Sequence, residues 1–195
     1  MKRIGVLVSG GGTNLQAIID GTLNGTIQGE VALVVSNRKN AFGLERAKKH
    51  GIPALYIGKG NYPEQADADA ALLEALESHE VDVVVLAGYL NILSPAMIAR
   101  YRNKIINIHP SLIPAYSGMG YYGMKVHEAV IANHEAYSGA TVHFVDEGTD
   151  TGEIIVQERV RVSEEDTPET LAKKVLVVEH RLLVESTAKL CSGNL

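Results

Sequence analysis

Short apolar runs alternate with stretches of helical periodicity over the first half of the chain. Apolar runs bounded by small or polar residues predict buried strands, and apolar residues spaced three or four apart predict amphipathic helices. The expected strands are Ile4–Val8, Val31–Val35, Ala54–Ile57, Val83–Leu86 and Ile105–Ile108, and the expected helices are Asn14–Leu23, Phe42–Lys49, Glu64–His79 and Met97–Tyr101. Strands that alternate with helices in this way favour a parallel, doubly wound sheet.

The second half of the chain has a different pattern. Residues 111–122 are rich in glycine and tyrosine and predict a loop, followed by a helix at Met124–Asn133. Ala140–Val145 and Ile154–Val162 flank a polar loop and should form an antiparallel strand pair. Asp166 or Thr167 can cap a long final helix whose first turn contains Pro168. The expected fold class is therefore α/β: a doubly wound, mostly parallel sheet with a Rossmann-like N-terminal half, an antiparallel C-terminal strand pair and a long C-terminal helix, all in a single domain over residues 1–195.

Composition narrows the class of protein without identifying it. The chain has 195 residues, 46% of them apolar and 21% charged, which is ordinary for a globular domain. Its formal net charge of −5, without a basic block, does not indicate a nucleic-acid partner. A single cysteine, Cys191, fits a reducing compartment, and no segment approaches the ~20 apolar residues of a membrane span. We therefore expect a cytoplasmic protein with no membrane association.

Asn107 and His109 stand out at the end of the apolar run Ile105–Ile108. Residues two apart in a strand point to the same face, so these two polar side chains should lie side by side. Pro110 lacks a backbone donor and should end the strand at His109. A carboxamide beside an imidazole on a rigid element suits a carbonyl that becomes an oxyanion, so we expect the chemistry at this point.

The glycine cluster Ser9–Asn14 joins the first expected strand to the first expected helix. Small residues let a ligand approach the backbone, and free amides at a helix N-terminus favour an anion such as phosphate. The cluster is not G-x-G-x-x-G and lacks the Lys-Ser/Thr ending of a Walker loop, which weakens NAD and ATP interpretations. A tight turn without a ligand is the alternative. Because His109 should lie at the same sheet edge, where ligands of such folds gather, a ligand site is favoured.

Asp150 lies in the polar loop 146–152. Such a residue, taken alone, is usually a turn former or solvated. If the loop folds over the sheet edge, its carboxylate would reach His109, raise the pKa of the imidazole and fix its tautomer. His143, on an alternating strand, is interpreted as a core residue or a neighbour of the site. No metal-ligand spacing such as H-E-x-x-H occurs, so no metal is expected.

Seven segments along the chain together carry a resemblance to a known family. They are Val8–Ile18, Ser36–Arg38, Ala41–Ala47, Leu86–Pro95, Ile108–Pro114, Gly139–Val145 and Glu179-His180. The chain resembles the folate-dependent formyltransferases, and within them the glycinamide ribonucleotide transformylase branch. The His-Pro-Ser-Leu-Ile-Pro segment is of a type shared by formyltetrahydrofolate-using hydrolases and transferases, whereas the opening glycine loop points to this branch.

The resemblance implies an activity and a set of residues for it. The reaction would transfer the formyl group of 10-formyltetrahydrofolate, a co-substrate, to the amine of 5′-phosphoribosylglycinamide in purine biosynthesis. The implied catalytic residues are Asn107, His109 and Asp150, with His109 protonated. The implied ribonucleotide contacts are Gly12, Thr13, Asn14 and Glu179. The implied folate contacts are Leu90, Asn91, Ile92, Leu93, Gln65, Asp146, Glu147, Gly148 and Thr149.

The resemblance also implies how the domain is divided and where the chain departs from its family. Residues 1–105 would form the half that binds the ribonucleotide phosphate, and residues 106–195 the catalytic and folate-binding half. Asn91 stands where the family often has arginine, and Gln65 falls on or near a second family arginine. Lys125 or the tyrosines of the segment 118–125 could replace the lost folate-tail contacts. The expected partners are the two small molecules, bound by a monomer or a homodimer.

Three other functions compete with formyl transfer to the ribonucleotide. Hydrolysis of 10-formyltetrahydrofolate is the nearest, but that relative carries an extra N-terminal domain. Formylation of initiator methionyl-tRNA normally requires a C-terminal barrel and a basic surface. A non-catalytic nucleotide-binding module would bind phosphate at Gly12–Asn14 and have no use for Asn107, His109 and Asp150 together. Since function resides in sites and not in folds, the sequence favours the transferase.

Overall fold

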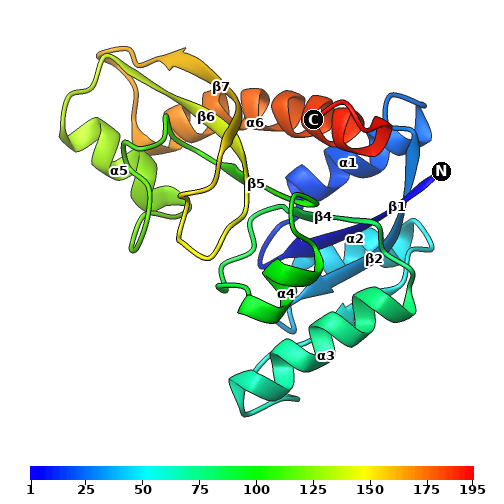
Figure 1. Cartoon of the computed structure of the whole chain (residues 1–195). Helices are drawn as coiled ribbons and strands as arrows, with labels where there is room; N and C mark the ends of the chain where they lie inside the picture. Colours follow the sequence, from blue (N-terminus) through cyan, green and yellow to red (C-terminus); the bar gives the residue numbers. More distant parts are fainter.

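The computed structural model describes residues 1–195 and contains one seven-stranded sheet (Figure 1). The strand order is β3-β2-β1-β4-β5-β6-β7. Strands β1 to β5 run parallel, while β6 is antiparallel to both β5 and β7. The strands are β1 (Lys2–Val8), β2 (Gly29–Ser36), β3 (Ala54–Tyr56), β4 (Val83–Leu86), β5 (Ile105–His109), β6 (Tyr137–Phe144) and β7 (Ile154–Arg161). The predicted fold class is confirmed.

Helices cover both faces of the sheet, as the continuous apolar strands require. Successive residues of a strand point to opposite faces, so Val6 of β1 joins one core cluster and Leu7 the other. The first cluster takes residues from α1 (Thr13–Leu23), α2 (Phe42–Lys49), α5 (Met124–Ala132) and α6 (Pro168–Ser192). The second cluster takes residues from α3 (Gln65–Ser78) and α4 (Pro95–Arg100). Figure 1 shows α1 and α6 together on one side of the sheet and α3 and α4 on the other.

Local chemistry fixes where the helices begin. The N-cap of α6 is Thr167, whose hydroxyl accepts a hydrogen bond from the Thr170 amide while the Thr170 hydroxyl accepts one from the Thr167 amide. This reciprocal cap satisfies two amides that the helix leaves without partners. The Ser94 hydroxyl caps α4 by accepting from the Met97 amide, with Pro95 in the first turn. The start predicted for the final helix is therefore confirmed.

The sheet order brings three loops to one edge. Strand β1 lies between β2 and β4 in the sheet. The connections after β1 and β2 therefore run toward one edge of the sheet and the connection after β4 toward the other. This divergence opens a crevice at the carboxyl ends of β1 and β4. The loops after β1 and β4 touch there, since the Leu90 amide donates to the Ser9 hydroxyl over 2.9 Å. Strand β5 ends at His109, directly before Pro110, as predicted. No helix combines the length and the apolar character that crossing a membrane would require.

Candidate active site

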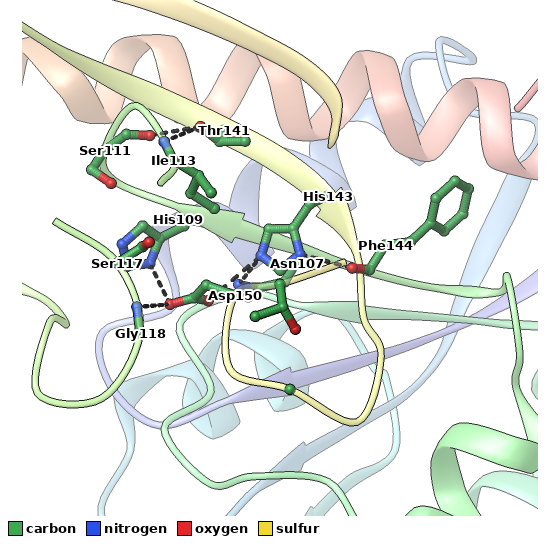
Figure 2. Close-up of polar contacts among 12 residues, drawn as sticks. Asn107, His109, Ser111, Ile113, Ser117, Gly118, Thr141, His143, Phe144 and Asp150 are labelled. Carbon is green, nitrogen blue, oxygen red and sulfur yellow. Dashed lines mark hydrogen bonds and ion pairs between the residues drawn. The ribbon is translucent and has the colours of Figure 1, made fainter. Parts of the chain in front are cut away.

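Asn107 lies opposite a histidine that belongs to the neighbouring strand. In the β5–β6 ladder Asn107 is the direct partner of His143, and the Asn107 Nδ2 atom lies 3.1 Å from His143 Nε2. His143 Nδ1 is 2.8 Å from the Phe144 carbonyl, which can only accept, so Nδ1 carries the proton and Nε2 accepts from Asn107. This fixes the orientation of the Asn107 carboxamide and leaves its second N–H for a ligand. Figure 2 shows the two side chains and Asp150 pointing toward one another.

His109 shares the face of Asn107 and is only 5% exposed. Its Nε2 atom lies 2.8 Å from the Tyr116 carbonyl oxygen, so Nε2 bears a proton. Its Nδ1 atom lies 3.5 Å from Asp150 Oδ2, too far for a strong hydrogen bond but close enough for a charge interaction. The proton that the ring can gain or lose is therefore the one on Nδ1.

Asp150 reaches His109 from the loop between β6 and β7, as the sequence predicted. Its backbone adopts the left-handed conformation (φ 56°), and its Oδ2 atom accepts from the Gly118 amide over 3.0 Å. Burial by itself raises the pKa of this carboxyl, but the contacts with His143, His109 and the Gly118 amide outweigh it, so the pKa lies below its ordinary value. The carboxylate is thus ionised at neutral pH.

The expected approach of Asp150 is confirmed, and its charge raises the pKa of His109 as predicted, but other effects outweigh that rise. Burial of the imidazole lowers its pKa and is the largest effect. The charge of Asp150 and the Tyr116 carbonyl both raise the pKa, and His143 lowers it further, with a net value below the ordinary one. The ring is therefore mainly neutral at neutral pH, and its protonated form needs a further negative charge nearby to stabilise it.

A cavity of about 310 Å³ opens onto these four side chains. It is lined by Asn107, His109, His143 and Asp150 together with most of the residues expected to contact folate, namely Leu90, Asn91, Ile92, Leu93, Asp146, Gly148 and Thr149. Two expected residues are not in its lining. Glu147 instead faces Arg102 at 3.5 Å. Gln65 lines a neighbouring cavity of about 430 Å³, which shares Leu90, Asn91 and Tyr122 with the first.

The glycine loop leaves the N-terminus of α1 open. Gly12 precedes the helix in the left-handed conformation (φ 73°), and no side chain caps the helix amides. A Cβ atom at Gly12 would lie 2.7 Å from the Gly43 Cα, so no other residue fits without a backbone shift. Gly10 and Gly11 face open space, where a ligand could approach the backbone. Thr13 begins the helix and lies beside this opening.

Asn14 and Glu179 form a buried polar pair beside the glycine loop. The Asn14 amide donates to Glu179 Oε2 over 2.9 Å, which joins α1 to α6 across 165 residues of sequence. Burial raises the pKa of the Glu179 carboxyl, and the Asn14 hydrogen bond offsets part of that rise. The Asn14 Oδ1 atom is buried without a partner. A buried acceptor without a donor is costly, so a ligand group that donates to it would be stabilising.

Sequence reasoning missed part of this arrangement. The direct contact of His143 with Asn107 depends on strand register, and only the alternation of Thr141 and His143 hinted at it. The hydrogen bonds of His109 to the Tyr116 carbonyl and of the Gly118 amide to Asp150 had no recognisable signal beyond a glycine-rich loop. No group of three or more His, Cys, Asp or Glu side chains is arranged to hold a metal ion.

Comparison with known proteins agrees with this geometry. A family model described as formyl transferase matches residues 2–187. The chain is 44% identical over 191 residues to the chloroplastic phosphoribosylglycinamide formyltransferase of Arabidopsis thaliana, which covers 97% of this chain and 65% of the relative. It is 42% identical over 182 residues to phosphoribosylglycinamide formyltransferase of Haemophilus influenzae, covering 93% of this chain and 84% of the relative.

A solved structure supports the same grouping. Glycinamide ribonucleotide transformylase 1 from Symbiobacterium toebii superposes with a TM-score of 0.93 at 44% identity, covering 99% of this chain and 89% of that one. The resemblance inferred from the sequence is thus confirmed. The chain spans less than two thirds of the Arabidopsis relative. A cytoplasmic location and a monomeric or dimeric state stay predictions.

Proposed function

The chain belongs to the formyl transferase family, and on that premise we propose that it transfers the formyl group of 10-formyltetrahydrofolate to the amine of 5′-phosphoribosylglycinamide in purine biosynthesis. The observation that carries the proposal is the convergence of Asn107, His109 and Asp150 on one cavity, next to an uncapped helix N-terminus. A binding module would need the phosphate loop but not a carboxamide, an imidazole and a carboxylate around a common space.

The ribonucleotide occupies the glycine loop and the buried pair behind it. Its phosphate binds the free amides at the start of α1, close to Gly12 and Thr13, where the helix dipole favours an anion. Donor groups of the ribonucleotide bind the unpartnered Asn14 Oδ1 and the Glu179 carboxyl. These contacts deliver the substrate amine toward the tip of β5.

The folate lies in the cavity of about 310 Å³. Leu90, Ile92 and Leu93 supply an apolar wall suited to a flat heterocycle, and the loop of Asp146, Gly148 and Thr149 supplies polar groups around its rim. The acidic tail continues into the neighbouring cavity, where Arg38 and Lys59 offer positive charge beside Gln65 and Asn91. These two cations take the place of the arginines that the family has at Asn91 and near Gln65.

The reaction needs no covalent enzyme intermediate. The substrate amine attacks the formyl carbon, the bond from that carbon to N10 of the folate breaks, and one proton moves from the amine to N10. Asn107 and protonated His109 donate to the formyl oxygen as it gains negative charge, and Asp150 stabilises the imidazolium. Burial of the His109 ring disfavours the imidazolium, and the negative charge of the developing oxyanion stabilises it in the transition state. Loss of either donor should cost about 10²–10³ in rate.

A single assay tests the proposal. The purified chain is mixed with 10-formyltetrahydrofolate, with and without the ribonucleotide, and folate absorbance is followed. We expect one molecule of folate to be deformylated for each molecule of ribonucleotide consumed. Asn107→Ala should lose nearly all of this deformylation. Deformylation that proceeds equally without the ribonucleotide would identify a hydrolase, and no deformylation in either mixture would reject formyl chemistry altogether.

The division of the chain is proposed along the same lines. Residues 1–105 form most of the ribonucleotide phosphate site and residues 106–195 carry the catalytic groups, within one domain. Each site also contains residues of the other half. Glu179 of the second half pairs with Asn14, and Leu90 to Leu93 of the first half line the folate cavity. The halves are therefore parts of one active site and not separable modules.

A further inference from the structure

We propose that the turn formed by residues 116–118, called here the clamp turn, positions both His109 and Asp150 for catalysis, and that a hydrogen bond from Tyr116 to Glu135 holds the turn in place. The inference rests on the proposed formyl transfer. It assigns positioning roles to Tyr116 and Glu135, which lie outside the reacting groups.

The clamp turn contacts both partners of the catalytic pair through its backbone. The Tyr116 carbonyl accepts from His109 Nε2 over 2.8 Å, and the Gly118 amide donates to Asp150 Oδ2 over 3.0 Å. Two polar groups only two residues apart thus set the positions of two side chains that lie 3.5 Å from each other. Figure 2 shows Gly118 and His109 both facing the same oxygen of the Asp150 carboxylate.

The geometry of the clamp turn is unusual and needs support. Tyr116 has φ 51° and Gly118 has φ 84°, both in the left-handed region. Glycine adopts this region freely, but a bulky aromatic residue does so only where its surroundings impose the conformation. Reversing the Tyr116 backbone to an ordinary conformation would redirect the carbonyl that now faces His109. The strain at Tyr116 is therefore the condition for the contact.

Two side-chain contacts hold Tyr116 in this conformation. Its hydroxyl donates to Glu135 Oε1 over 2.7 Å, and Glu135 lies just before β6, so the bond ties the loop to the sheet. Its ring meets the Tyr121 ring edge to face, with centroids 5.8 Å apart and planes at 83°. The Ser117 hydroxyl, which donates to the Pro114 carbonyl, closes the turn internally. Of these contacts the bond to Glu135 is the one that can be removed without changing the shape of the ring.

The clamp turn decides which nitrogen of His109 takes part in the chemistry. With the Tyr116 carbonyl on Nε2, the neutral ring keeps its proton there and presents Nδ1 to Asp150 and the reacting atoms. Without that carbonyl the proton could occupy either nitrogen, and part of the population would hold the wrong tautomer. The turn should then affect the catalytic step and leave substrate affinity unchanged.

The first test removes the hydroxyl alone. Tyr116→Phe should lower kcat about fivefold, the effect of losing one hydrogen bond, with both KM values unchanged. Tyr137→Phe is the matched control, since this exposed tyrosine lines the same surface pocket as Glu135 without touching His109, and its kcat should equal that of the wild type. Glu135→Ala should reproduce the loss, and Glu135→Gln, which keeps an acceptor oxygen, should restore most of it. The double variant Tyr116→Phe/Glu135→Ala should be no slower than either single variant.

A second test reports on the tautomer and does not depend on activity. Nitrogen-15 NMR of the histidine rings above neutral pH should show His109 as a single Nε2–H tautomer in the wild type and as a mixture in Tyr116→Phe, with His109→Gln used for assignment. Wild-type kcat and a single tautomer in Tyr116→Phe would overturn the inference. A wild-type chain without formyl transfer would reject the proposed function instead, and the tautomer would still decide the role of the clamp turn.

Discussion

At the scale of single residues, the site depends on a balance between burial and charge at His109. The ring is almost fully enclosed, which disfavours its cation, yet Asp150 and the Tyr116 carbonyl favour it. A ring that is neutral at rest and charged in the transition state can respond to the oxyanion as it forms. A permanently protonated ring would offer less of this differential stabilisation.

This balance gives a first prediction, on pH. We expect the NMR titration midpoint of His109 to lie below 6.5, because burial lowers its pKa more than Asp150 raises it. In Asp150→Asn the midpoint should fall further, since the raising charge is removed. For stability the sign follows from the lowered pKa: the neutral ring favours the folded state, so stability is lost as pH falls from the ordinary histidine range to the lowered pKa.

A neighbouring carboxylate provides the control for this titration. Glu147→Gln changes an exposed charge in the same loop, paired with Arg102 and outside the cavity, and should leave the His109 midpoint where it is. A midpoint above 6.5 in the wild type would show that burial does not outweigh the charge of Asp150. A midpoint that rises in Asp150→Asn would show that this charge does not raise the pKa of His109.

At the scale of elements, the sequence predicted what local chemistry controls. Strand β5 ends at His109 because of Pro110, and α6 begins at Pro168 because Thr167 before it caps the helix. Strand β6 begins three residues earlier than expected, at Tyr137, because Ser138 and Gly139 interrupt the apolar run but still pair with β7. The partner of Asn107 and the clamp turn were not predictable, since register and hydrogen bonds between distant segments decide them.

The pair that joins α1 to α6 gives a prediction at this scale. Glu179→Gln should become increasingly stabilising, relative to the wild type, as pH rises. Burial raises the pKa of Glu179, so the wild type has its full stability below the ordinary glutamate pKa and loses it as pH rises through the raised value. The glutamine has no charge to bury and can still accept from Asn14. Thermal unfolding at several pH values measures the difference.

A second glutamate on α6 serves as the control. Glu185 is exposed and lies 3.5 Å from Arg181, so Glu185→Gln should show no growing advantage with pH. The Glu179→Gln variant should also bind the ribonucleotide more weakly while binding folate as before. Equal pH dependence of the two variants would contradict the account of the buried carboxyl.

At the scale of the whole molecule, the active site exists only because the sheet joins distant parts of the chain. The fold class was predictable because alternating strands and helices allow few topologies. The larger core cluster draws on β1, β5, β6 and α6 together, so it is shared by both halves, whereas the smaller cluster lies wholly within residues 1–105. The crevice between β1 and β4, with α6 behind it, places the proposed ribonucleotide and folate sites along one edge.

The last prediction follows from this shared core. The chain should unfold in a single cooperative transition, with coincident midpoints by far-ultraviolet circular dichroism and tyrosine fluorescence. Either the ribonucleotide or tetrahydrofolate, at about 100 times its Kd, should raise that one Tm by about 5–10 °C. In Asn14→Ala the shift caused by the ribonucleotide should be lost and that caused by tetrahydrofolate retained. Two transitions, or a ligand shift confined to one probe, would mean that the halves fold separately. The Asn14–Glu179 hydrogen bond would then cross an interface between two domains instead of lying within one core.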